Sequence, residues 1–174
     1  MFNLSNSAVI LLEALRIKRG PQEFGSWFQD AVESALGTMD SYRKCYANLV
    51  AGQPDIIAGG TGFEVKSTSD GTVALEGNYQ EIRTHYKHFK LVGLRTDVRP
   101  FPLWVLEMPK DPPTRVTFKH IMDSITPRDE ALNQELARRL SNVLVAAGTS
   151  WIEAEDRNAA RDVLKRTTDV MVSL

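Results

Sequence analysis

The spacing of apolar residues changes twice along this chain, and no other feature constrains its fold as strongly. Residues 5–18 and 22–36 carry apolar side chains at helical spacing, and Gly20-Pro21 interrupts the two runs. Between residues 41 and 108, short apolar runs are bounded by glycine and proline, which is typical of strands. Helical spacing then returns from Pro127 onward. This order predicts an α/β fold, in which N-terminal and C-terminal helices flank a central mixed sheet.

The individual elements follow from the same spacing. We predict strands at 41–48, 54–58, 62–68, 91–96 and 103–108, with a helix at 76–88 between the third and fourth. Pro127 suits the first turn of a helix that ends at Gly148, and Ser150 is placed to cap a final helix. The length of 174 residues suits a single domain, with a core at about 22–108 and a helical part at about 127–174.

Composition excludes several classes of protein. The longest apolar runs are about five residues, whereas a membrane helix needs ~20, so we expect no membrane span. The N-terminus lacks the features of a secretory signal, and we expect a cytoplasmic protein. The single Cys45 excludes an internal disulfide and a cysteine-based zinc site. The 21 basic and 22 acidic residues leave nucleic-acid binding open, because such binding depends on a local basic surface.

Three charged residues stand within strand-like sequence between residues 53 and 68. They are Asp55, Glu64 and Lys66, and charges in a core hairpin are costly unless they pair or bind a ligand. If an even-length turn is centred on Gly60-Thr61, Asp55 lies opposite Lys66, and Ile57 lies opposite Glu64. All three charges then share one face of the hairpin. A turn of odd length would shift the register and separate them.

Two carboxylates beside one amine suggest metal-dependent chemistry. Hard oxygen ligands with open positions suit Mg²⁺, and Mn²⁺ is able to substitute for it. A bound ion polarises a phosphodiester and activates water, while the Lys66 ammonium stabilises charge on the phosphate. The trio therefore predicts phosphodiester hydrolysis. The alternative is that the three residues are ordinary surface charges beside a turn, where ion pairs contribute only ~0–1 kcal/mol.

The same residues resemble a known family. Pro54-Asp55, a glycine turn, and Glu64-Val65-Lys66 on the next strand look like the PD-(D/E)xK nuclease superfamily, which includes most type II restriction endonucleases. The resemblance covers residues 22–108, about half of the chain. It implies a restriction-endonuclease-like core in which Asp55, Glu64 and the Val65 carbonyl hold Mg²⁺ and Lys66 is the catalytic amine. It also implies cleavage of double-stranded DNA by a homodimer.

One part of the family pattern is altered. Many relatives carry Gly-x-x-Phe-Glu on a helix before the first strand, and the corresponding stretch here is Gly25-Ser26-Trp27-Phe28-Gln29. Gln29 replaces the acid, and Glu33 lies one turn farther along the helix. Whether Gln29 or Glu33 joins the site stays open.

Other residues suggest contacts with DNA or a partner subunit. Arg83, Lys87 and Lys90 form a basic stripe if 76–88 is a helix, and they are our candidates for phosphate contacts. The alternative for this stripe is a solvated helix face. His85 and His88 are three apart, but we see no third metal ligand near them. Trp104 is expected in the core, while Trp27 and Trp151 suit either a dimer interface or base stacking.

Two other functions remain possible from the sequence. The chain suits a structure-specific or repair nuclease of the same superfamily, such as a junction resolvase. It also suits a DNA-binding or assembly module that keeps the fold without activity. Cleavage of linear duplex, dependence on branched DNA, and binding without cleavage distinguish these three functions.

Overall fold

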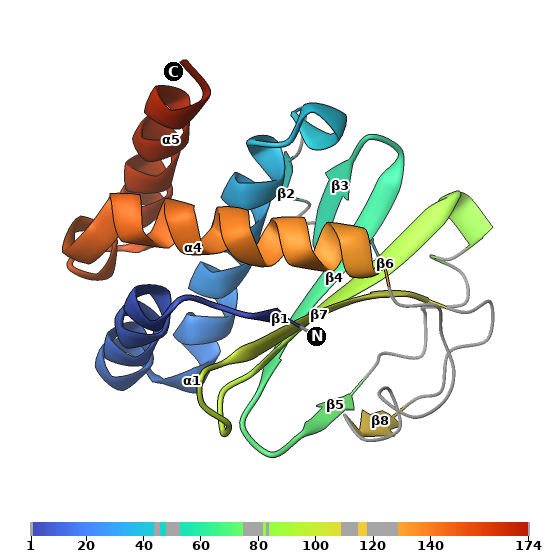
Figure 1. The fold of residues 1–174 in the computed structure, drawn as a ribbon, viewed down its shortest axis with the longest axis horizontal. Coiled ribbons are helices and arrows are strands. Elements are labelled where there is room, and N and C mark those ends of the chain that lie inside the picture. Colours follow the sequence, from blue (N-terminus) through green and yellow to red (C-terminus); the bar gives the residue numbers. More distant parts are fainter. Residues whose placement is uncertain are drawn as a thin grey trace.

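The computed structural model of this protein describes residues 2–43, 46–47, 53–74, 82, 84–108, 115–117 and 129–173. Its architecture is α/β, with a mixed sheet flanked by helices (Figure 1). The long helices α1 and α4 lie together beside the sheet, and α5 packs on both of them. The predicted fold class, with helices at both ends of the chain, is confirmed at this level.

The main sheet has six strands. They are β1 (Phe2–Asn3), β2 (Tyr46–Ala47), β3 (Ile56–Ala58), β4 (Thr61–Thr68), β6 (His88–Arg95) and β7 (Pro102–Glu107), and their order is β1-β7-β6-β4-β3-β2. Only β4 and β6 run parallel, and all the other neighbours are antiparallel. A small second sheet pairs β5 (Thr72–Ala74) with β8 (Arg115–Thr117). The sequence patterns predicted neither β1 nor this small sheet, because strands of two or three residues carry little alternation.

The helices are α1 (Asn6–Gly37), α4 (Glu130–Ile152) and α5 (Arg157–Ser173), with a 3₁₀ turn η1 at Asp40–Tyr42. As predicted, α1 consists of two helical segments separated at Gly20, which has φ of +79° and precedes Pro21. Ser5 caps its start by accepting a hydrogen bond from the backbone N–H of Ala8. Gly148 breaks α4 in the same way, with φ of +59°, but the helix resumes for one turn beyond it.

Several predicted boundaries are wrong. Ser150 lies inside α4, and α5 is capped instead by Asp156, whose Oδ1 accepts from the N–H of Ala159 at 2.8 Å. Within the strand predicted at 41–48, residues 41 and 42 belong to η1 instead, and the described strand residues are Tyr46 and Ala47. The helix predicted at 76–88 cannot reach its expected end, because β6 begins at His88. Residues 75–81, Arg83 and Pro127 lie outside the described residues.

Apolar side chains pack on both faces of the sheet. The larger core lies between the sheet and the helices, and it includes Phe63 and Val65 of β4. The smaller core lies on the opposite face and includes Leu91, Trp104 and Leu106. Residues of β4 therefore alternate between the helix side and the opposite side, as the pleat requires. Within the described part of the chain, no helix combines the length and apolar character needed to cross a membrane.

Candidate active site

The turn between β3 and β4 sets the geometry of the site. Gly59 and Gly60 are its two central residues, with φ of +56° and +77°. Two positive φ values in a two-residue hairpin turn strongly favour glycine at both positions. A Cβ atom on Gly59 would also lie 2.7 Å from the carbonyl oxygen of Ser41, so this position cannot accept a side chain without a shift of the backbone.

The predicted register of this hairpin was wrong by one residue at its centre. The turn is centred on Gly59-Gly60 rather than Gly60-Thr61, because only the first pair supplies two glycines. Ile56 pairs with Phe63, and Ile57 pairs with Gly62. The ladder ends at Ile56, so Asp55 is not paired with Lys66 as predicted, and its side chain instead contacts Val65, the residue after Glu64. The turn has even length, and Glu64 and Lys66, two residues apart, share one face of β4, while the Asp55 side chain accepts from a backbone N–H at the strand edge.

A backbone hydrogen bond fixes Asp55 against β4. Its Oδ2 accepts from the N–H of Val65 at 2.9 Å. The β3–β4 ladder ends here, because the next residue in register with Val65 is Pro54, which has no N–H to contribute. The N–H and C=O of one strand residue point to the same side of the strand, so the Val65 carbonyl also points toward the Asp55 side. This places Asp55 and the Val65 carbonyl at one edge of β4.

Glu64 and Lys66 project from β4 on the face opposite α1 and α4. The side chain of Glu64 is 7% exposed, and that of Lys66 is 30% exposed. The Nζ of Lys66 lies 3.3 Å from Oε1 of Glu64. Burial of a carboxylate is unfavourable unless it is paired or binds a ligand. The alternative interpretation, in which the three residues are ordinary surface charges beside a turn, therefore does not hold for Glu64.

Two acidic residues of α1 pair with arginines of α5. Asp30 is buried with 3% exposure, and both of its oxygens bind Arg157, at 2.8 Å from Nε and 2.9 Å from Nη2. One turn farther along α1, Glu33 lies 3.7 Å from Nη2 of Arg161. Gln29, which occupies the family position, is partly buried. The structure thus brings Glu33 close to α5 and adds Asp30, which the sequence patterns did not single out.

Nearby acids raise the pKa of Arg157. Hydrogen bonds to Asp30 raise the pKa of Arg157 above its ordinary value, and the charges of Asp30, Glu33 and Asp55 raise it further against the effect of burial. Two signals for this cluster were present in the sequence. Asp30 is an isolated acid three residues after Trp27 in an otherwise apolar stripe, and Arg157 and Arg161 are four residues apart on one helix.

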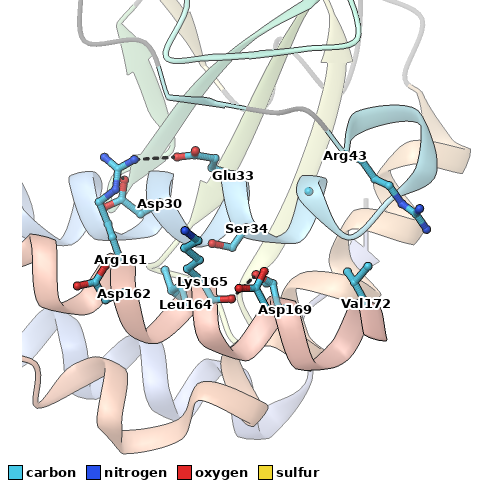
Figure 2. Close-up of a pocket in the computed structure, with 12 residues that line it drawn as sticks. Asp30, Glu33, Ser34, Arg43, Arg161, Asp162, Leu164, Lys165, Asp169 and Val172 are labelled. Carbon is cyan, nitrogen blue, oxygen red and sulfur yellow. Dashed lines mark hydrogen bonds and ion pairs between the residues drawn. The ribbon is translucent and has the colours of Figure 1, made fainter. Parts of the chain in front are cut away.

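A groove of about 540 Å³ lies between the second half of α1 and α5 (Figure 2). Its walls are mostly charged. Asp30 and Glu33 contribute from α1, and Arg161, Asp162, Lys165 and Asp169 contribute from α5. Figure 2 shows the Arg161 guanidinium directed toward Glu33, with Asp30 beside them. The groove therefore includes Asp30, Glu33 and Arg161 of this cluster, whereas Arg157 does not line it.

The predicted basic stripe is not a helix face. Lys90 belongs to β6 and is buried, and its Nζ binds Glu107 and Asp129, each at 2.9 Å. We therefore withdraw Lys90 as a phosphate contact, because its hydrogen-bonding capacity is committed to two carboxylates. Lys87 is exposed just before β6. Arg83 lies outside the described residues, so the stripe is reduced to Lys87.

The tryptophans are structural. Trp27 and Trp151 are 3% and 0% exposed, and their rings pack 6.2 Å apart between α1 and α4. Neither ring is available for base stacking or for a dimer interface. Trp104 is buried in the sheet, as predicted. Cys45 lies outside the described residues.

The site offers a small set of ligands for a divalent ion. The described residues contain no group of three or more His, Cys, Asp or Glu side chains able to hold a metal. Asp55, the buried Glu64 and the Val65 carbonyl are hard oxygen donors, and Mg²⁺ is commonly held by one or two carboxylates with water and substrate phosphates. The donor set therefore fits Mg²⁺. His88 contacts Glu107 at 3.3 Å and takes no part in this set.

Comparison with known proteins assigns no family. No protein-family model matches the chain, and neither the curated proteins nor the solved structures contain a match.

Proposed function

We propose that this protein is a Mg²⁺-dependent endonuclease that hydrolyses phosphodiester bonds of double-stranded DNA, with a restriction-endonuclease-like core. The observation that carries the proposal is the arrangement at the edge of β4. A buried Glu64 lies beside Lys66, and Asp55 is anchored to the neighbouring backbone N–H of Val65. A buried carboxylate next to a partly exposed amine at a sheet edge is costly for stability, and a role in catalysis explains why it is kept.

In this proposal, Asp55, Glu64 and the Val65 carbonyl hold the ion. Mg²⁺ bound there supplies a Lewis acid for the phosphate and lowers the pKa of a bound water. Asp55 keeps its orientation because the N–H of Val65 fixes one of its oxygens. The second carboxylate, Glu64, lies on β4 next to Val65, the residue whose N–H binds Asp55.

Lys66 contributes charge at the reacting phosphate. Its side chain is 30% exposed, so the ammonium reaches both Glu64 and a substrate in the solvent-facing space beyond it. A fixed cation stabilises the negative charge that develops on the phosphate oxygens, and removal of one such group typically costs ~10²–10³ in rate. Since water is the nucleophile, no covalent enzyme intermediate forms.

The biological role that we favour is sequence-specific cutting of duplex DNA by a cytoplasmic homodimer, as in type II restriction endonucleases. Two copies related by a twofold axis would present two sites to the two strands of a near-palindromic sequence. Digestion of linear duplex and of branched DNA in parallel separates this role from that of a structure-specific nuclease.

The test uses charge-neutral variants of the two acids. Asp55→Asn keeps an oxygen that accepts from Val65, and Glu64→Gln keeps the volume of the buried side chain, so both should fold. Glu153→Gln, at an exposed position, is the matched control. We expect wild type and the control to cut plasmid DNA with Mg²⁺ or Mn²⁺, and both site variants to lose cleavage.

Calorimetric titration with Mn²⁺ gives a second measurement that is independent of cleavage. Both site variants should lose most of the binding heat seen for wild type and Glu153→Gln. Equal cleavage by the acid variants and wild type would reject the assignment of the ligands. Absence of cleavage by wild type across supercoiled, linear and branched DNA would reject the function itself.

A further inference from the structure

Arg157 is held in one orientation by a buried acid. Two of its N–H groups bind the two oxygens of Asp30 at 2.8 and 2.9 Å, and Asp30 is only 3% exposed. The fork of a guanidinium carries five N–H donors in all. Among the described residues, the structure assigns no acceptor to the remaining donors of Arg157, and 33% of its side chain is exposed. Asp30 therefore orients Arg157 without using all of its binding capacity.

Arg161 is held more loosely, one turn along α5. Its nitrogens lie 3.9 Å from Asp30 and 3.7 Å from Glu33, and both distances exceed the ~2.7–3.2 Å of a hydrogen bond. Its side chain is 36% exposed and lines the groove between α1 and α5 (Figure 2). Because residues four apart lie on the same side of a helix, Arg157 and Arg161 present adjacent guanidinium groups.

The pair of arginines has the chemistry of a phosphate-binding position. Both oxygens of Asp30 hold Arg157, and Arg161 lies within ion-pair range of Asp30 and Glu33 and lines the groove. Guanidinium groups bind phosphate oxygens through paired N–H donors, and carboxylates placed behind them fix their geometry. We propose that Arg157 and Arg161 form a phosphate-binding position for the DNA strand next to the scissile bond, with Asp30 as the positioning residue of Arg157.

This proposal deepens the proposed function and depends on it for the identity of the ligand. A backbone phosphate bound between the two side chains would complete the hydrogen bonding of both guanidinium groups. The phosphate contacts predicted for Lys90 would then come from α5.

The experiment measures binding of a fluorescent 30-base-pair duplex by anisotropy, over a series of salt concentrations, with Ca²⁺ in place of Mg²⁺. Arg161→Ala removes one proposed contact. The double variant Asp30→Asn with Arg157→Ala removes the other and leaves neither an unpaired buried acid nor a changed net charge. Arg166→Ala is the matched control, because Arg166 is exposed on the same helix and does not line the groove.

We expect Arg161→Ala and the double variant each to weaken binding about tenfold and to lower the slope of log affinity against log salt by ~0.9, the value for one lost phosphate contact. Arg166→Ala should change the affinity less than about twofold and leave the slope unaltered. A thermal melt of each variant checks folding. If the double variant does not fold, Arg161→Ala against Arg166→Ala still decides the proposal.

The outcomes separate this inference from the proposed function. If Arg161→Ala and the folded double variant keep the wild-type slope while wild type cuts DNA, the phosphate position is wrong and the nuclease function stands. If both variants lose slope but wild type cuts no DNA with any divalent metal, the phosphate position stands and the nuclease function fails. A wild-type protein that binds no duplex would overturn the phosphate position.

Discussion

Two lysines on the neighbouring strands β4 and β6 each lie beside carboxylates, but in different surroundings. Lys90 is buried on the helix side of the sheet, level with Phe63, and binds Glu107 and Asp129 at 2.9 Å each. Lys66 is on the other face, 30% exposed, and lies 3.3 Å from the single carboxylate of Glu64. The two ammonium groups therefore differ in how fully their hydrogen bonds are satisfied.

This difference separates a structural lysine from a candidate catalytic one. Asp129 also caps α4, since its Oδ1 accepts from the N–H of Leu132. Lys90 thus joins β6, β7 and the start of α4, and it has little capacity left for a substrate. Lys66 keeps both space and donors on its open side. Geometry and solvent access, rather than the residue type, distinguish the two lysines.

The largest effect that we expect is the loss of catalysis at Lys66. Lys66→Ala should lower the rate of DNA cleavage by about 10²–10³-fold, because a cation beside the developing charge is removed. Its unfolding midpoint should change little, because the lysine is partly exposed and makes one long contact. Lys18→Ala, at an exposed position of α1, is the control. Wild-type cleavage by Lys66→Ala would remove the distinction between the two lysines.

Lys90→Ala should act on stability instead. It leaves Glu107 and Asp129 without their shared cation, and loss of one partner from a buried ion pair costs about 3–5 kcal/mol. We expect the lower end, about 3 kcal/mol, because the side chain of Asp129 is still 33% exposed. Urea denaturation measures the difference against wild type and Lys18→Ala. A change below about 1 kcal/mol would show that the cluster is not structural.

We expect an intermediate effect from substitution of Gly62, which packs against Pro54, the residue before Asp55. A Cβ atom on Gly62 would lie 2.7 Å from Cγ of Pro54 and 3.1 Å from Cδ2 of Phe89. Gly62→Ala should therefore destabilise the fold by about 1–3 kcal/mol and reduce cleavage by moving Pro54 and the adjacent Asp55. Gly25→Ala is the control, since a Cβ there meets nothing within 4 Å and alanine favours the helix. Equal stability of the two variants would contradict this account.

The smallest expected effect is on the pH dependence of stability. Burial raises the pKa of Asp129, but hydrogen bonds from Lys90 and Leu132 leave it below the ordinary value. A lowered pKa in the folded state stabilises the protein above the unfolded value of ~3.9, and this stability is lost as pH falls further. Burial lowers the pKa of Lys90, but Asp129 and Glu107 raise it overall, so its contribution is lost only as pH rises beyond ~10.4.

Replacement of Lys90 by methionine isolates this dependence. Lys90→Met should flatten the fall in unfolding free energy between about pH 5 and pH 3 relative to wild type, because Asp129 loses the cation that lowers its pKa. Parallel curves for the two proteins, measured by denaturation at each pH, would show that Lys90 does not control the titration of Asp129.

The candidate site shows where sequence patterns suffice and where they fail. The spacing of two residues placed Glu64 and Lys66 on one face of β4, but the predicted turn centre was wrong by one residue, and Asp55 reaches β4 through a side-chain hydrogen bond instead of the predicted pairing. The stripe that grouped Lys90 with Lys87 assumed a helix, and β6 begins at His88 instead. A spacing of three residues has a different meaning in a strand, where neighbours alternate between faces.

Local sequence determined the helices at the two ends, the strands between them, and the charged residues at the edge of β4, because periodicity and turn chemistry act over a few residues. Tertiary structure alone decided which charges meet. Asp30 and Arg157 are 127 positions apart, and their contact depends on how α5 packs on α1. The same packing decides which lysine is enclosed by carboxylates and which stays open, since burial and electrostatic pairing depend on the whole fold.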